Sequence, residues 1–250
     1  MPSTELLYGR NAVREALRAG RRRFRRLIVA ERAREGGGPR DILDEARRAG
    51  VAVLEAPRQQ LDRAAPGVNH QGVMLEAGAY PYVDFADLVE LTGGERTPLY
   101  LALDQLQDPQ NVGTLLRTAE AVGVGGVLIP EHRAAAITPA VVNASSGATE
   151  HLRIAPVTNL ARSLERLKEA GVWVAGLEGV PEAGPLDEAD LRGALALVVG
   201  SEGGGISRLV RERCDFLVRL PMRGRIASLN AAVAGSIALY AIDRQRREAS

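Results

Sequence analysis

The stretch ALALVVGSEGGGIS, residues 194–207, decides the fold of the second half of this chain. It opens with a continuous apolar run, residues 194–199, that ends in β-branched side chains, which is typical of a buried strand in a parallel sheet. The run stops at Gly200, and a glycine-rich loop with one acid, Glu202, follows it. Because open α/β sheets bind ligands at the carboxyl ends of their strands, this loop is a candidate binding site.

Two more polar loops follow shortly afterwards in the chain. The segment FLVRLPMRGR, residues 216–225, gives another apolar strand that runs into a loop, and the tripeptide SLN, residues 228–230, opens a long apolar helix. We expect the three loops to meet in one place. The many small residues of the last helix, residues 229–247, indicate close packing against another helix, in the same chain or in a partner chain.

The glycine-rich loop differs from the common nucleotide-binding loops. It lacks the Lys-Ser/Thr pair of a P-loop, and its glycines do not follow the pattern G-x-G-x-x-G. No second strand ending in an acid follows it at the distance expected of a dinucleotide-binding fold. A tight turn with spare glycines is the structural alternative.

Positive charge is concentrated near the N-terminus. The chain has 250 residues, 46% of them apolar, and a net charge of +1. Residues 1–76 contain fifteen arginines and ten acids, a net charge of +5, so the remainder carries −4. The run RRRFRR, residues 21–26, favours contact with RNA or DNA phosphates, although a solvated connection is the alternative. The candidate RNA-binding residues of this run are Arg21, Arg22, Arg23, Arg25 and Arg26.

Composition also argues against several classes of protein. The single cysteine, Cys214, excludes an intrachain disulfide, and the three histidines have neither metal-ligand spacing nor paired cysteines, so we expect no metal. No apolar run approaches the roughly 18 residues of a membrane span, and the first residues do not form a signal peptide. We therefore expect a cytoplasmic protein without a membrane partner.

The chain divides into three parts by pattern. Residues 1–76 alternate helix and strand and predict a small α/β domain, and residues 77–97 contain the glycines and prolines of a linker. Residues 98–250 begin with a strand at 99–103, a polar loop at 104–113 and a helix at 114–122, which predicts a strand–helix–strand unit. This interpretation places Arg117 in the first turns of the helix, where the helix dipole disfavours a cation.

Three segments of the second half together resemble the motifs of a known family. The segment DPQNVG, residues 108–113, with RTA at 117–119, resembles the first motif of the SpoU (TrmH-like) RNA 2′-O-ribose methyltransferases of the SPOUT superfamily. VVGSEGGG at 198–205 resembles the second motif, and LPM through SLN at 220–230 resembles the third.

The N-terminal part resembles the substrate-binding domain of one branch of this family. The segments YGRNAVREAL at 8–17 and NHQG at 69–72 carry this resemblance. The branch includes the enzyme that methylates a guanosine of 23S rRNA.

The resemblance implies a fold, a cofactor and a partner. The catalytic domain would be a parallel α/β sheet with a C-terminal trefoil knot, preceded by a small α/β RNA-binding domain, and the protein would be a homodimer. S-adenosylmethionine would be held largely by backbone groups, which map to Gly200, Leu220 and Leu229. The catalytic residues would be Arg117, Asn111, Glu202, Ser228 and Asn230, and Arg10 would join the RNA-binding residues.

The implied reaction is methylation of a ribose 2′-hydroxyl in RNA, with a guanosine of 23S rRNA as the expected acceptor. A tRNA 2′-O-methyltransferase and a non-catalytic RNA-binding protein on the same fold are the alternatives. Arg117 would either act as the base or clamp an RNA phosphate while Glu202 or water takes the proton. A guanidinium is a poor base because its pKa normally lies above about 12.

Overall fold

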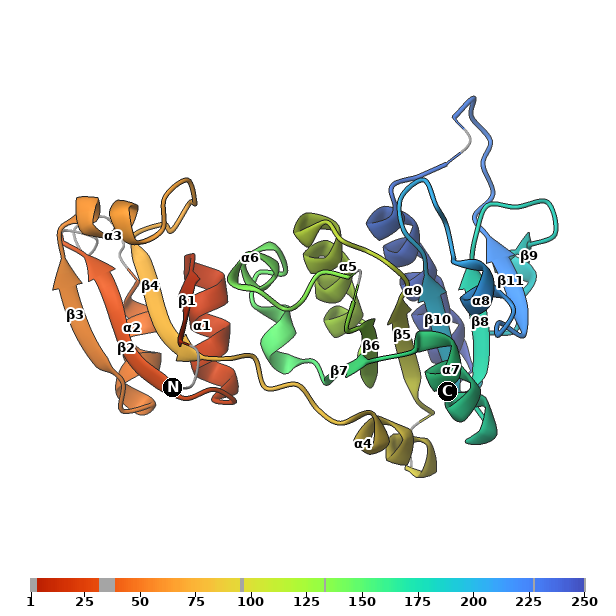
Figure 1. The fold of residues 1–250 in the computed structure, drawn as a ribbon, viewed down its shortest axis with the longest axis horizontal. Coiled ribbons are helices and arrows are strands. Elements are labelled where there is room, and N and C mark those ends of the chain that lie inside the picture. The colour runs from red at the N-terminus through yellow and green to blue at the C-terminus, as the bar shows by residue number, and fades with distance from the viewer. Residues whose placement is uncertain (1–3, 32–38, 95–96, 133, 227, 250) are drawn as a thin grey trace. The chain divides into compact units, whose positions relative to one another are not determined.

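The computed structural model describes residues 4–31, 39–94, 97–132, 134–226 and 228–249 (Figure 1). The chain separates into two compact units. Unit 1 comprises residues 1–81 and 137–151, and unit 2 comprises residues 82–136 and 152–250. The chain therefore passes from one unit to the other at three places.

Four of the described strands form the mixed sheet of unit 1, in the order β1-β4-β2-β3. They are β1 (Thr4–Tyr8), β2 (Phe24–Ala30), β3 (Ala52–Ala56) and β4 (Val73–Gly78). Strand β4 is antiparallel to both neighbours, whereas β2 and β3 are parallel. The expected small α/β unit of the N-terminal region is therefore present.

Helices pack on both faces of the two inner strands of this sheet, β4 and β2, which carry most of its buried apolar residues. Ile28 of β2 and Met74 of β4 pack with Leu61 of α3 (Arg58–Ala64). Alternation along a strand places the buried Leu27 on the opposite face. Helices α1 (Arg10–Ala19) and α2 (Arg40–Arg48) contact each other, and each contacts the sheet.

Residues 137–151 join unit 1 although they lie far from it in sequence. They form α6 (Pro139–Ala144), which Thr138 caps, and the short helix η2 (Ala148–His151). Both contact α1, and Asn143 Nδ2 donates to the carbonyl of Tyr8 at 3.0 Å. This grouping differs from the expected organisation, in which residues 98–250 form one domain. The reason is that residues 137–151 contact β1 and α1, which lie far from them in the sequence.

In the described part of unit 2, seven parallel strands form the sheet, in the order β7-β6-β5-β10-β8-β11-β9. Their bounds are β5 Leu99–Leu103, β6 Gly126–Pro130, β7 Ile154–Val157, β8 Trp173–Leu177, β9 Gly184–Pro185, β10 Leu195–Val199 and β11 Phe216–Arg219. The apolar run before the glycine-rich loop thus supplies the central strand, β10.

Helices cover both faces of this sheet. Helices α4 (Phe85–Glu90), α7 (Leu160–Glu169) and α8 (Arg208–Arg211) pack on one face, in a cluster that includes Tyr100 and Val198. The short helices η1 (Leu91–Gly93) and η3 (Leu186–Glu188) belong to connections.

Helices α5 (Pro109–Ala121) and α9 (Ala231–Glu248) pack against each other, and α9 also contacts β8 and β10. A Cβ at Gly235 of α9 would lie 2.8 Å from Leu115 of α5, so the expected close helix packing occurs within this chain.

Helix α5 begins five residues earlier than expected. Asp108 caps it, accepting from the backbone N–H groups of Gln110 at 3.3 Å and Asn111 at 3.2 Å, and Pro109 follows at a position where no N–H is needed. Arg117 consequently lies in the middle of the helix, and the unfavourable dipole position inferred from the sequence is wrong.

Among the described residues, no helix combines the length and the apolar character needed to cross a membrane.

Candidate active site

A cavity of about 550 Å³ opens in unit 2 where the three expected loops converge. It lies beyond the carboxyl ends of β8, β10 and β11 and beside the start of α9. Its volume is within the range of small-molecule sites, roughly 300–1,000 Å³. Six of the sequence-predicted site residues line it: Gly200, Glu202, Leu220, Ser228, Leu229 and Asn230.

The glycine-rich loop closes on itself at the rim of this cavity. Ser201 and Gly205 exchange two backbone hydrogen bonds of 3.0 Å. A Cβ at Gly200 would lie 2.2 Å from the carbonyl carbon of Gly205, which is closer than any real contact allows. Gly200 is therefore required for the turn itself, before any ligand is considered.

Three polar residues from the three motifs form a hydrogen-bonded cluster at the cavity. Asn111 Nδ2 donates to Glu202 Oε1 at 2.7 Å, and Asn230 Nδ2 donates to Asn111 Oδ1 at 3.0 Å and also to Glu202 Oε1. The other amide atom of Asn230 caps α9, since Oδ1 accepts from the backbone of Ala232 at 2.9 Å and of Val233 at 3.2 Å. Asn230 therefore connects the start of α9 to Glu202.

Arg117 lies apart from this cluster. It is exposed on α5, and six residues separate it from Asn111, which corresponds to about 9 Å along the helix axis and roughly 120° around it. Arg117 is not among the residues that line the cavity. The structure thus brings Asn111, Glu202, Ser228 and Asn230 together at one site and leaves Arg117 on a neighbouring surface.

Sequence reasoning missed one acid of this cavity, Glu178. It follows the last residue of β8, lines the cavity and pairs through Oε1 with Arg211 at 2.5 Å. The hydrogen bond to Glu178 raises the pKa of Arg211. The sequence pattern does not indicate Glu178, because β8 precedes β10 in the chain. Only the pairing of Leu177 with Val199 places Glu178 beside the glycine-rich loop.

The arginine run of unit 1 is not uniformly exposed. The Arg22 side chain is fully buried and pairs with Glu150 at 2.8 Å and Glu5 at 2.6 Å, so the expected RNA contact of Arg22 is wrong. Arg21 donates to the carbonyls of Glu150 and Pro81, at 3.2 and 3.1 Å.

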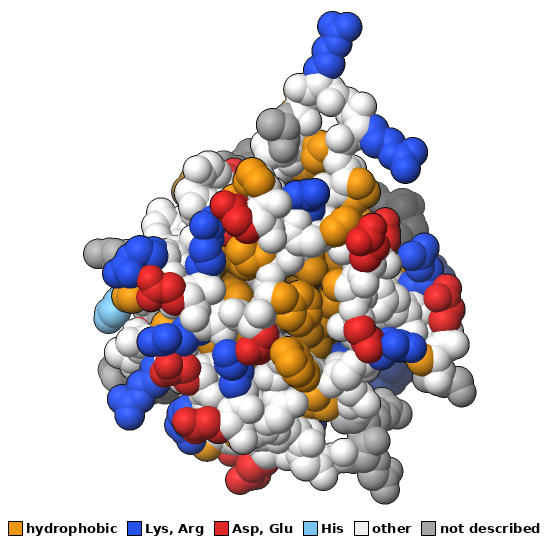
Figure 2. Space-filling model, turned by 90° about the vertical axis from the view of Figure 1, so that its right-hand side faces the viewer, with side chains coloured by type: hydrophobic (Ala, Val, Ile, Leu, Met, Phe, Trp, Pro, Cys, Tyr) orange, Lys and Arg blue, Asp and Glu red, His pale blue; other side chains and the backbone are white. Residues whose placement is uncertain are grey.

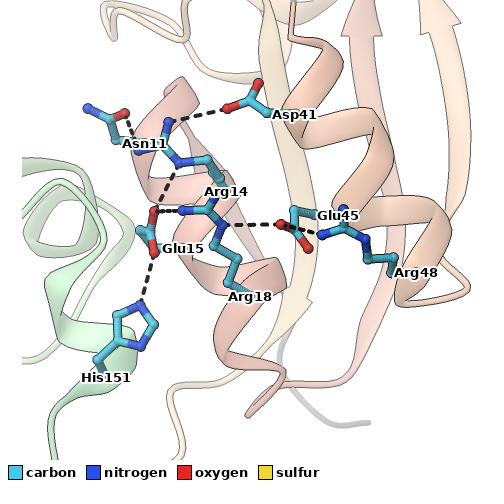
Figure 3. A network of polar contacts seen from close by, with 8 residues as sticks. All are labelled: Asn11, Arg14, Glu15, Arg18, Asp41, Glu45, Arg48 and His151. Atoms are coloured by element: carbon cyan, nitrogen blue, oxygen red, sulfur yellow. Dashed lines mark hydrogen bonds and ion pairs between the residues drawn. The ribbon is translucent and has the colours of Figure 1, made fainter.

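Three of the arginines expected to bind RNA are exposed: Arg10, Arg23 and Arg25. Arg26 is half-buried and pairs with Glu76 at 2.6 Å. Figure 3 shows that Arg14, Arg18 and Arg48 of α1 and α2 also face carboxylates. The positive field of unit 1 is therefore weaker than its arginine count indicates.

The described residues contain no group of three or more His, Cys, Asp or Glu side chains placed to hold a metal ion.

This combination of a doubly covered parallel sheet and a cavity at its strand ends defines an α/β domain that binds a small molecule. A profile of the SpoU rRNA methylase family matches residues 98–240, and one for RNA 2′-O ribose methyltransferase substrate binding matches residues 6–83. YacO of Bacillus subtilis, named as a TrmH family tRNA/rRNA methyltransferase, is 42% identical over 243 residues, which cover 97% of this chain and 96% of the relative. The chain belongs to the SpoU family of RNA methylases.

Solved structures have the same fold. AviRb, a SpoU methyltransferase of Streptomyces viridochromogenes crystallised with S-adenosylmethionine, superposes with a TM-score of 0.80 at 22% identity, over 98% of this chain and 91% of AviRb. A TrmH-family protein of Porphyromonas gingivalis superposes with a TM-score of 0.73 at 28% identity, over 99% of this chain and 90% of that chain. The expected family and α/β fold are confirmed, and S-adenosylmethionine is the cofactor of this family.

Proposed function

We propose that this chain transfers the methyl group of S-adenosylmethionine to a ribose 2′-hydroxyl of RNA, with a guanosine of 23S rRNA as the acceptor. The observation that carries the proposal is the convergence of the second and third motifs on one cavity, with Asn111 of the first motif hydrogen-bonded to the lining residues Glu202 and Asn230. The match of residues 6–83 to a 2′-O ribose substrate-binding domain supports the ribose as the acceptor.

The cavity fits S-adenosylmethionine by size and by chemistry. Its volume of about 550 Å³ is sufficient, and its wall combines apolar side chains with the backbone of Gly200, Leu220 and Leu229. A buried oxygen of Glu178 has no hydrogen-bond partner among the described residues, so the wall also offers an unused acceptor. When bound, the cofactor supplies an electrophilic methyl group.

The residues of the cavity have separate roles in this proposal. Two amide groups, of Asn111 and Asn230, donate to Glu202 and fix the orientation of its carboxylate at the cavity wall. Glu202 is therefore a preorganised acceptor for the proton of the ribose hydroxyl. Ser228 lines the same cavity and shapes the loop before α9.

Arg117 acts as a clamp for an RNA phosphate rather than as the base. Its exposure on α5, outside the cavity, suits contact with a large polyanion. A guanidinium also binds phosphate in a bidentate manner, whereas it gives up a proton only at a pH above about 12.

We also propose that the protein forms a homodimer that associates through α9. Four large apolar residues lie exposed along one stripe that begins just before this helix: Leu229, Val233, Ile237 and Tyr240. A hollow lined by Leu220, Met222 and Ile237 adjoins it, and Figure 2 shows hydrophobic side chains gathered in the middle of this face. A C-terminal trefoil knot and a cytoplasmic location are further parts of the proposal.

Transfer of tritium from labelled S-adenosylmethionine to RNA tests the activity. We expect label in 23S rRNA, and after alkaline hydrolysis the label should appear in dinucleotides, because a 2′-O-methyl group blocks cleavage of the adjoining phosphodiester. The Asn230→Ala variant should transfer at least tenfold less label. Label found only in tRNA would overturn the rRNA assignment. Binding of RNA without any transfer would favour the non-catalytic alternative.

Mapping 2′-O-methyl groups in rRNA from a strain lacking the protein would identify the nucleotide. Loss of one guanosine methylation is expected, and restoration by the wild-type chain but not by Asn230→Ala is the control.

A further inference from the structure

Glu178 has an unusual position beside the glycine-rich loop. Its side chain is 11% exposed, and Oε1 pairs with Arg211 at 2.5 Å. Oε2 is buried and has no hydrogen-bond partner among the described residues, although Glu178 lines the cavity. Buried carboxylate oxygens are normally hydrogen-bonded. Arg211 Nε is also buried without a hydrogen-bond partner among the described residues, but only Glu178 of this ion pair lines the cavity, where a bound ligand can supply a partner.

The glycine-rich loop is shaped around this carboxylate. Gly205 has a φ of +63°, which side chains rarely adopt, and a Cβ there would lie 2.7 Å from Glu178 Oε1. Glycine at 205 therefore both allows the turn and leaves room for Glu178. The backbone of Glu178 is fixed too, because its N–H donates to the carbonyl of Val218 at 2.9 Å.

The arrangement of strands has a counterpart in other α/β domains. Dinucleotide-binding folds place a glycine-rich loop after one strand and an acid in the region of a later strand, where the acid binds a ribose hydroxyl. Here the loop follows β10, and Glu178 follows β8, which pairs directly with β10 through Leu177 and Val199. The order of the two strands along the chain is reversed, so the acid precedes the glycine-rich loop in the sequence.

We propose that Glu178 is a cofactor-binding residue whose free carboxylate oxygen accepts a hydrogen bond from a ribose hydroxyl of S-adenosylmethionine. This inference rests on the proposed function. It identifies the ribose as the part of the cofactor that contacts Glu178, the residue after β8. The Arg211 guanidinium already balances the negative charge of Glu178, which favours a neutral hydroxyl over the ammonium group of the methionine part.

Calorimetry with the full-length chain tests this assignment without measuring methyl transfer. The ligands are S-adenosylmethionine and 5′-methylthioadenosine, which retains the ribose but lacks the amino-acid part. We expect Glu178→Ala to weaken both by the same factor, about tenfold or more, as expected for loss of a hydrogen bond to a charged group. Glu182→Ala is the matched control, because Glu182 is an exposed acid of the following loop and does not line the cavity.

A second comparison identifies the hydroxyl groups as the partner. The wild type should bind 5′-methylthioadenosine more tightly than its 2′-deoxy or its 3′-deoxy analogue, and Glu178→Ala should lose this preference. Glu178→Gln, of the same size, should weaken binding less than Glu178→Ala, and it serves as the test if the alanine variant does not fold.

Two results would overturn the inference while leaving the proposed function intact. One is weaker binding of S-adenosylmethionine with unchanged binding of 5′-methylthioadenosine, which would place Glu178 at the ammonium group. The other is unchanged affinity for both ligands. A wild-type chain that binds neither ligand would overturn the proposed function together with the inference.

Discussion

Arg22 and Glu150 form a bidentate ion pair across 128 residues of sequence, with Arg22 Nε 2.9 Å and Nη2 2.8 Å from the two carboxylate oxygens. Both side chains are fully buried. The ring of Tyr80 lies 5.1 Å from the Arg22 guanidinium, and the Tyr80 hydroxyl donates to the carbonyl of Thr149 at 2.7 Å. This pair attaches residues 137–151 to the sheet of unit 1.

Removal of one partner of this pair should destabilise the protein strongly. We expect Arg22→Met to cost about 3–5 kcal/mol, because it leaves the Glu150 charge buried and unpaired. The double variant Arg22→Met with Glu150→Leu should recover most of the loss. Arg48→Met is the control, since Arg48 is exposed and pairs with Glu45 at 2.9 Å, a contact worth about 0–1 kcal/mol (Figure 3). Urea unfolding measures these three variants and the single variant Glu150→Leu, and additive effects of the two buried substitutions would contradict the prediction.

Two substitutions of Asn230 should separate stability from activity. Serine keeps an oxygen that can cap α9 but loses the amide that donates to Asn111 and Glu202. We expect Asn230→Ser to unfold within about 0.5 kcal/mol of wild type and Asn230→Ala to lose about 1 kcal/mol. Both should lose methyl transfer at least tenfold. Full activity in the serine variant would show that the hydrogen bonds to Glu202 are dispensable.

Arg117→Ala should retain the fold and cofactor binding but lose methyl transfer. The side chain is exposed and lies outside the cavity, so neither core packing nor the cofactor site depends on it. Arg117→Lys should keep part of the activity, since a cation still meets the phosphate without bidentate geometry. Calorimetry measures cofactor binding, and the tritium assay measures methyl transfer. Turnover of Arg117→Ala above about a third of wild type would remove Arg117 from the mechanism.

The exposed arginines of unit 1 should contribute to RNA binding through phosphate contacts. Replacing Arg10, Arg23 and Arg25 with Gln should lower the slope of log affinity against log salt by roughly 0.7 to 0.9 for each lost contact. Cofactor affinity should not change. The charge-matched control replaces Arg40, Arg47 and Arg48 of α2, also exposed. Equal slopes for both triple variants in filter binding would contradict a specific role.

The single cysteine should be unreactive in the folded protein. Burial, with the nearby Asp215 and Glu178 carboxylates, raises the pKa of the Cys214 thiol to about 12. Its thiolate, the reactive form, is therefore scarce at pH 8 to 10. We expect negligible reaction with Ellman's reagent in buffer and one thiol per chain in denaturant. Rapid labelling of native protein at pH 8 would contradict the raised pKa.

The sequence alone determined the parts of this protein that depend on local pattern. The apolar run at 194–199 predicted the buried strand β10, and the apolar residues after the tripeptide at 228–230 predicted the last helix, α9. The placement of three polar loops, after two apolar strands and before the last helix, predicted that the loops would meet in one place, and all three line the cavity. These predictions succeeded because strand burial, helix formation and the position of loops along the chain depend on residues close together in the sequence.

Only the tertiary structure decided which charged residues are buried and which carboxylate lies beside the glycine-rich loop. Arg22, Arg23 and Arg25 belong to one arginine run, and nothing in the sequence distinguishes them. Of the three, only Arg22 is buried, and it pairs with Glu150, 128 residues away. Glu178 reaches the loop after β10 through the pairing of two strands whose order in the sheet differs from their order in the chain. The energy of a charged side chain depends on the solvent and partners that surround it, and distant parts of the chain supply both.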